Sequence, residues 1–140
     1  VGTKNLLTFL KLKKIKCFIC SVRKNKNIIK KFLTKNRINQ YFSGIYLMED
    51  LGLNIDNNSS SNRVLIKNSL IHKIIKSHSI LDRNIMFIGN SKDDYDSSLN
   101  MHVKFIHYVD SYNNFQFKNT IKVKNMPNLQ QKLVKVFKNI

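Results

Sequence analysis

Hydrophobic residues follow two patterns along this chain. In some segments they recur every three or four positions, which is typical of an amphipathic helix, and in others they form short continuous runs, which are typical of strands buried on both faces. The first pattern predicts helices at 4–13, 24–35, a stretch around 70–75, 93–100 and 128–138. The second predicts strands at 15–20, 85–88 and 103–109, with a short fourth strand at 120–123.

Two further segments fit neither pattern. Residues 41–46, Tyr-Phe-Ser-Gly-Ile-Tyr, are expected to turn into a short extended piece. Residues 54–62, Asn-Ile-Asp-Asn-Asn-Ser-Ser-Ser-Asn, are expected to form a flexible loop, because these residue types favour local turns and bury little surface. No internal repeat is visible, so we interpret residues 1–140 as one domain that this loop interrupts.

The order of these elements defines the expected fold class. Strands alternate with helices, and the strands are apolar throughout, which favours a three-layer, Rossmann-like α/β domain with a mostly parallel sheet. Ligands bind such sheets beyond the carboxyl ends of the strands. The candidate functional residues are therefore Ser21, after the first strand, and residues 89–96, after the second.

The high net charge of the chain is weak evidence for a nucleic-acid partner. The net charge is +17 in 140 residues, which invites a nucleic-acid partner. However, the chain has no alanine, and Lys, Asn and Ile make up 57 of its residues, a bias that an AT-rich genome produces without selection for a partner. Arginine, the residue best suited to phosphate and base recognition, occurs four times. We therefore do not expect nucleic-acid binding, although a basic nucleic-acid-binding module remains an alternative.

Cysteine and histidine indicate no metal or redox centre. Cys17 and Cys20 lack the second ligand pair of a structural zinc site, and within a strand they point to opposite faces. The histidines are expected to be solvated or incidental: His72, His78, His102 and His107. No apolar run approaches the ~20 residues that span a bilayer, and the N-terminus lacks a signal-peptide core. The expected location is the cytoplasm, without a membrane partner.

The segment after the second strand is the most informative in the chain. Gly89 allows a sharp turn, and Asp93, Asp94 and Asp96 then place three carboxylates within four residues. Mg²⁺ is one way to relieve their mutual repulsion. A helix N-terminus that favours acids through its dipole is the other. The pattern by itself leaves both interpretations open.

This segment resembles the fourth motif of the haloacid dehalogenase-like phosphohydrolases, in particular of proteins similar to phosphoglycolate phosphatase. That motif is an apolar strand followed by Gly-Asp-Ser-x-x-x-Asp. Here Asn90 stands in place of the first acid and Asp94 at the second. The serine-containing helix and the strand that follow, up to about residue 110, resemble the family as well.

Other segments resemble the family in the expected order. Ser21 resembles the second-motif residue, which hydrogen-bonds the substrate phosphoryl group, and 42–45 resembles the Phe-x-x-Ile turn. Lys67 fits the third-motif lysine, a catalytic residue that binds the phosphoryl group and neutralises its charge. The resemblance implies a Mg²⁺-dependent phosphoric monoester hydrolase that acts on a small phosphorylated metabolite. Asp94, with Asn90 or Asp93, would anchor the metal.

One motif of the family is absent from the sequence. The first motif, Asp-x-Asp-x-Thr after an apolar strand, supplies the nucleophile and the general acid/base in the family. We therefore expect this chain to be a C-terminal portion of a core domain, without its first strand and cap and inactive alone. The alternative is a non-catalytic remnant or partner-binding module of the same fold, in which Asn90 is tolerated because no activity depends on it.

Overall fold

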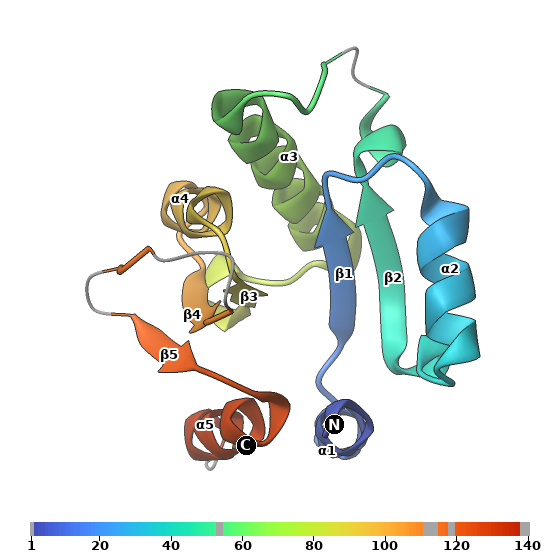
Figure 1. Ribbon diagram of the computed structural model, residues 1–140, viewed down its shortest axis with the longest axis vertical. Coiled ribbons are helices and arrows are strands. Elements are labelled where there is room, and N and C mark those ends of the chain that lie inside the picture. The colour runs from blue at the N-terminus through green and yellow to red at the C-terminus, as the bar shows by residue number, and fades with distance from the viewer. Residues whose placement is uncertain (1, 53–54, 111–114, 118–119, 138–140) are drawn as a thin grey trace.

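The computed structural model describes residues 2–52, 55–110, 115–117 and 120–137 (Figure 1). The helices are α1 (Thr3–Leu12), α2 (Lys26–Lys35), α3 (Ser60–His78), α4 (Lys92–Asn100) and α5 (Met126–Val136), with short 3-10 turns η1 (Asn39–Tyr41), η2 (Met48–Leu51) and η3 (Asp82–Asn84). The strands are β1 (Cys17–Ser21), β2 (Phe42–Leu47), β3 (Met86–Gly89), β4 (Lys104–Tyr108) and β5 (Ile121–Val123).

The strands form two sheets, and every pairing is parallel. β1 pairs with β2, and β3, β4 and β5 form a second sheet in that order. The predicted α/β class with parallel strands between helices is therefore confirmed. The division into two sheets, visible between β1 and β3 in Figure 1, was not expected from the sequence.

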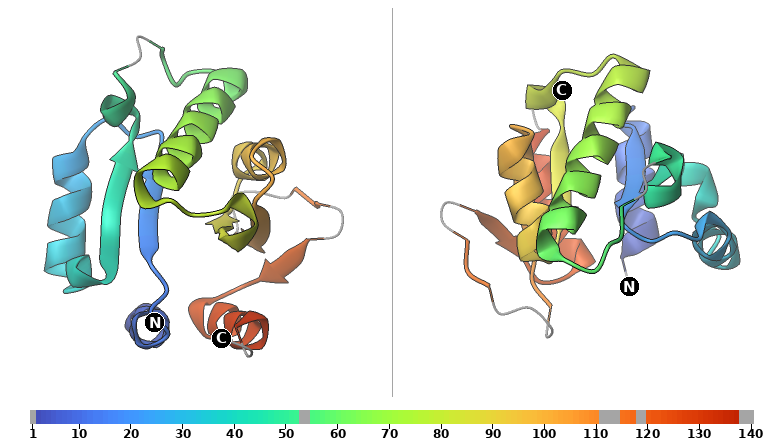
Figure 2. Two further views of the ribbon diagram at one scale, coloured as in Figure 1. Left: turned by 180° about the vertical axis from the view of Figure 1, so that it is seen from behind. Right: turned by 90° about the horizontal axis from the view of Figure 1, so that it is seen from above.

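Three hydrophobic clusters hold the layers together. α1 belongs to two of them, because Leu7 packs with Leu33 of α2 on the first sheet, whereas Leu6 and Leu10 pack with α5 and the second sheet. The third cluster lies under α3, where Ile66 is fully buried. Helices α1, α2 and α5 thus pack on one side of the strands, and α3 and α4 lie together on the other (Figures 1 and 2).

Several element boundaries differ from the prediction. Residues 42–47 are a full strand that pairs with β1, not a turn with a short extension. The loop predicted at 54–62 ends earlier, because the Ser59 side chain accepts a hydrogen bond from the Asn62 N–H and caps α3, which begins at Ser60. Helix α5 begins two residues before the predicted position, capped in the same way by Asn125. Residues 54 and 138 lie outside the described residues.

His107 is the clearest error among the sequence predictions. It was expected to be solvated, but it is 1% exposed on β4. Its ring packs against Phe105 and Phe117, and neither ring nitrogen has a hydrogen-bond partner. Burial, aided by the charge of Lys122 and opposed by that of Asp110, lowers the pKa of His107. The imidazole is therefore held neutral in the folded protein.

His78 is not an incidental residue either. Its ring packs against Phe18 in a tilted arrangement, and its Nε2 atom lies 2.9 Å from the Tyr46 hydroxyl. This contact fixes the end of α3 against β1 and β2. Within the described ranges, none of the helices combines the length and the apolar character needed to cross a bilayer.

The burial of His107 predicts a pH dependence of stability. Because the folded state lowers its pKa below the usual value of 6.5, the unfolded chain takes up the proton first, and stability should fall as the pH drops through 6.5. His107→Phe should flatten the dependence of the unfolding midpoint on pH between about pH 5 and pH 7.5. His72→Gln, a change at an exposed histidine of α3, is the control and should leave that dependence intact.

Candidate functional site

The turn between β3 and α4 forms the centre of the site. Ser91 is the N-cap of α4, and its Oγ accepts a hydrogen bond from the Asp94 N–H at 3.2 Å. In return, Asp94 Oδ2 accepts hydrogen bonds from the N–H groups of Asn90 and Ser91, both at 3.2 Å, and from Ser91 Oγ at 2.9 Å. This is a capping box, and it folds the Asp94 carboxylate back over the end of β3.

Gly89 makes this arrangement possible. A Cβ atom added at Gly89 would lie 2.6 Å from the Asp94 Cβ, far inside any normal contact. The glycine is therefore required here by the close approach of the Asp94 side chain, and not by an unusual backbone conformation.

Lys67 reaches the same carboxylate from helix α3. Its Nζ lies 2.5 Å from Asp94 Oδ1, and both residues are 8% exposed. Cys20, near the end of β1, lies close enough to Lys67 and Asp94 for both charges to affect its pKa. Burial raises the pKa of Cys20 to about 12, with Lys67 opposing the effect and Asp94 adding to it, so the thiol stays neutral. β1, α3 and α4 therefore meet at this ion pair.

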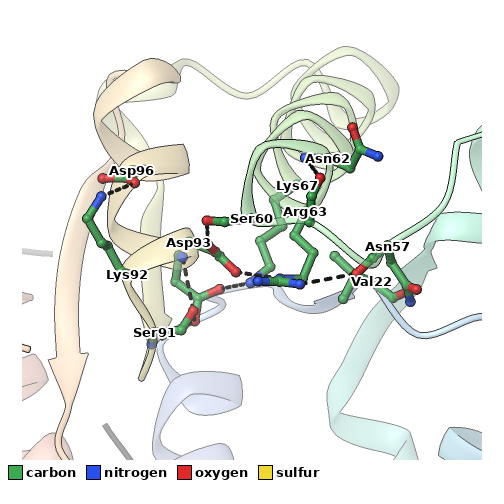
Figure 3. Close-up of polar contacts among 12 residues, drawn as sticks. Val22, Asn57, Ser60, Asn62, Arg63, Lys67, Ser91, Lys92, Asp93 and Asp96 are labelled. Carbon is green, nitrogen blue, oxygen red and sulfur yellow. Dashed lines mark hydrogen bonds and ion pairs between the residues drawn. The ribbon is translucent and has the colours of Figure 1, made fainter. Parts of the chain in front are cut away.

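A second ion pair, between Arg63 and Asp93, lies beside Lys67 (Figure 3). Arg63 Nε donates to Asp93 Oδ2 at 2.7 Å, and the Ser60 hydroxyl donates to Asp93 Oδ1. Burial alone would raise the pKa of Asp93, but these hydrogen bonds and the charges of Arg63 and Lys67 together hold it below its usual value. Asp93 is thus ionised and bound to α3 through both oxygens.

The network continues to the residue after β1. Arg63 donates a second hydrogen bond to the Asn57 carbonyl at 3.2 Å, and the Asn57 amide donates to the Val22 carbonyl at 3.1 Å (Figure 3). Just before it, Ser21 Oγ accepts a hydrogen bond from the Arg23 N–H at 3.2 Å. The chain after β1 is therefore fixed to the N-terminus of α4 through one arginine.

Asn90 faces the end of β4. Its side-chain amide donates to Asp110 Oδ2 at 2.5 Å. Asn90, which occupies the position of an acid in the family motif, is therefore hydrogen-bonded to a carboxylate that follows β4.

The structure thus places some of the predicted site residues in contact with one another, whereas Asp93 contacts a different helix. Lys67 and Asp94 are in direct contact, with Asn90 adjacent, and Ser21 follows Cys20 at the end of β1. Asp93 turns instead toward α3. Sequence reasoning missed four residues of the network: Asn57, Ser60, Arg63 and Asp110. The spacing of Arg63, one helical turn before Lys67, was an available signal.

The donor set can be tested against the Mg²⁺ ion that the family resemblance implies. Magnesium requires oxygen ligands with free lone pairs in near-octahedral geometry. Here both oxygens of Asp93 and of Asp94 accept bonds from protein donors, and Asn90 would offer only a neutral carbonyl oxygen, because its amide nitrogen donates to Asp110. Within the described part of the chain, no group of three His, Cys, Asp or Glu residues is placed to hold a metal. As arranged, these residues do not fit Mg²⁺ on their own.

Parallel strands with polar side chains gathered at their carboxyl ends define a Rossmann-like α/β protein. Residues 1–108 match the family described as haloacid dehalogenase-like hydrolase, and the chain belongs to this family. The resemblance found on the motifs is therefore confirmed. A comparison with functionally curated proteins finds no match to the sequence.

Solved structures with the same fold agree with this family. A HAD-superfamily hydrolase from Ehrlichia chaffeensis is 19% identical, with a TM-score of 0.72, and the match covers 97% of this chain and 58% of that one. The core domain of a protein proposed to be a phosphoglycolate phosphatase, from Streptococcus pneumoniae TIGR4, is 14% identical with a TM-score of 0.69, over 100% and 88% of the two chains. A predicted phosphatase from Clostridium acetobutylicum is 18% identical with a TM-score of 0.69, over 96% and 59%.

The buried ion pair predicts a sharp contrast between two lysines. Lys67→Met leaves the Asp94 charge buried without its partner, so the free energy of unfolding should fall by about 3 kcal/mol or more. Lys92→Met removes the exposed partner of Asp96 and should change stability little. Chemical denaturation of both variants measures the difference. Equal losses would contradict the central position of the Lys67–Asp94 pair.

Proposed function

We propose that residues 1–140 form the phosphoryl-binding part of a phosphatase core that acts on a small phosphorylated metabolite. The supporting observation is the buried Lys67–Asp94 pair, held at the carboxyl ends of β1 and β3. Ligands of Rossmann-like sheets bind at this edge, and the family is one of hydrolases. Since the chain spans 58% of the length of the first matched structure, the activity of the whole protein is part of this proposal.

Each residue at this edge has a chemical task in the proposal. Lys67 places a positive charge where phosphoryl oxygens gain negative charge in the transition state. Asp94 positions that ammonium group through the 2.5 Å contact, so Asp94 is a positioning residue. Ser21 accepts a hydrogen bond from the Arg23 N–H, which leaves its hydroxyl proton available to donate to a phosphoryl oxygen.

The nucleophile is proposed to come from polypeptide outside residues 1–140. Asp93 and Asp94 are poorly suited to attack phosphorus, because their oxygens already accept bonds from Ser60, Arg63, Lys67 and Ser91. Members of the family generally use Mg²⁺. In this chain, any such ion would depend on carboxylates that arrive with the nucleophile, since the residues present do not fit it by themselves. A cytoplasmic location and one domain over 1–140 remain part of the proposal.

A second candidate function is a non-catalytic protein of the same fold. The observation that favours it is Asn90, which replaces an acid of the motif and is engaged by Asp110. In such a protein the Lys67–Asp94 pair would serve stability only, and phosphate would not bind beside it.

The two candidates differ in phosphate binding. If the proposal is correct, inorganic phosphate should raise the unfolding temperature more than chloride does at equal ionic strength. At a hundredfold excess of phosphate over its Kd, the free energy of unfolding should rise by about 2.7 kcal/mol. Ser21→Ala should remove most of this effect. Ser43→Ala, at an exposed strand serine, should retain it. A phosphate effect that is absent, or that both variants keep, would favour the non-catalytic protein.

Turnover provides a separate test of the missing nucleophile. The isolated chain, with or without Mg²⁺, should not hydrolyse an aryl phosphate above the buffer rate. The measurement is the release of the coloured phenol, with Lys67→Met as the comparison for contaminating phosphatases. Hydrolysis by the wild-type chain that Lys67→Met abolishes would show that the chain contains its own nucleophile and would refute this part of the proposal.

A further inference from the structure

The positive charge of the chain is concentrated in its first third. Residues 1–48 contain 12 Lys and Arg residues and no Asp or Glu, whereas residues 49–140 contain 13 Lys and Arg residues together with all 8 acids. A base-composition bias acts on the whole chain alike, so it does not account for this difference. The basic part forms α1, β1, α2 and β2. Such an asymmetry of charge indicates an anionic partner for this part of the molecule.

Strand β2 is the outer edge of this basic part. Among the described residues it pairs only with β1, and α2 lies alongside it at the outer end of the sheet (Figures 1 and 2). Residues of α2 and β2 line a groove of about 430 Å³, to which β2 contributes the four consecutive residues 42–45. Consecutive residues of a strand point to opposite faces, so a groove that touches all four runs along the edge of the strand. Backbone N–H and C=O groups at such an edge can pair with another strand.

The side chains of the groove define the kind of strand that fits it. On α2, Lys26, Lys30 and Thr34 line the groove at successive turns of the helix. Lys26 is paired with Asp50 at 2.5 Å, but Lys30 has no ion-pair partner among the described residues. Leu33 adds apolar surface to the same groove. Because strand residues alternate between two faces, the complementary sequence alternates acidic and apolar residues.

We propose that the groove between α2 and β2 binds an extended acidic segment of another protein, which adds a strand to the outer edge of β2. Main-chain hydrogen bonds to β2 supply affinity, and a carboxylate placed at Lys30 supplies specificity for an acidic sequence. This interaction goes beyond the proposed phosphatase activity. Residues 42–45 begin β2, whereas the Lys67–Asp94 pair lies at the carboxyl ends of β1 and β3.

Charge favours this occupant over a second copy of the chain. Two β2 edges that paired with each other would bring together two basic parts that contain no acid, and like charges oppose such a contact. A nucleic acid is attracted by the same charge, but it has no strand edge to pair with β2. The residues that line the groove also include no arginine, the side chain best suited to phosphate recognition. An acidic peptide therefore fits the groove better than either alternative.

The chain has no tryptophan, so a tryptophan in a probe peptide reports binding without background. The probe is the peptide Glu-Val-Glu-Trp-Glu-Val-Glu with both ends blocked. It should bind one to one and slow hydrogen exchange in residues 42–47 by about tenfold or more, without changing exchange in residues 104–108. One control peptide has Lys in place of every Glu. The other has Pro in place of both Val residues, which keeps the charge but removes two N–H donors. Neither control should bind.

Two charge-reversal variants of the chain locate the binding site. Lys30→Glu should raise the Kd of the probe about fivefold or more. Lys124→Glu, the same change at an exposed lysine that follows β5, is the matched control and should keep the Kd within about twofold.

Several results would overturn the proposal. These are no binding of the probe up to about 1 mM at low salt, slowed exchange outside residues 42–47 only, or an equal loss of affinity in both variants. Sedimentation that shows a dimer of the chain, which the probe dissociates, would assign the edge to a second copy instead. If single-stranded DNA displaces the probe and the proline peptide binds as tightly as the probe, the groove is a general polyanion surface, and strand addition is rejected.

Discussion

The rest of the structure depends on the buried contact between Lys67 and Asp94. Two charges removed from water are tolerated only when each satisfies the other and the remaining lone pairs find donors. Asp94 meets both conditions, because Lys67 binds one oxygen while Ser91 and two backbone N–H groups bind the second. That requirement accounts for the glycine at the end of β3, the serine cap of α4 and the crossing of α3 over α4.

The neighbouring Arg63–Asp93 pair contributes to the arrangement of the two sheets. Through Asn57 it connects α4 to the chain after β1. The polar contacts on this side and the α1 leucines on the other act on the same two sheets. Among the described residues the two sheets share no strand, and side-chain packing of α1 and the ion pairs between α3 and α4 connect them. The site is consequently formed where the two halves of the molecule meet.

The sequence predicted the parts of this structure that depend on local pattern. Apolar runs indicated β1, β3 and β4, the motif after Gly89 pointed to Asp94, and the resemblance to the family's third motif pointed to Lys67. Residues 41–46 were interpreted as a turn into a short extended piece, because Ser43 and Gly44 interrupt the apolar run, and only pairing with β1 reveals the full strand. The contacts of Arg63 link helices 30 positions apart in the chain, and no local pattern encodes such a pairing. His107 was misassigned because its burial comes from Phe117, which follows β4.

The arrangement of α1 has a consequence for the order of folding. Each sheet contains a unit whose strands are close in sequence, β1–α2–β2 in one and β3–α4–β4 in the other, so these units close shorter loops than the contacts between α1 and α5. α1 is different, because Leu6 and Leu10 pack with α5, far away in the sequence, although Leu7 packs with α2. We therefore expect α1 to complete its packing only after α5 has formed. Until α5 has formed, Leu6 and Leu10 lack part of the cluster that buries them, so the packing of this face of α1 depends on a segment far away in the sequence.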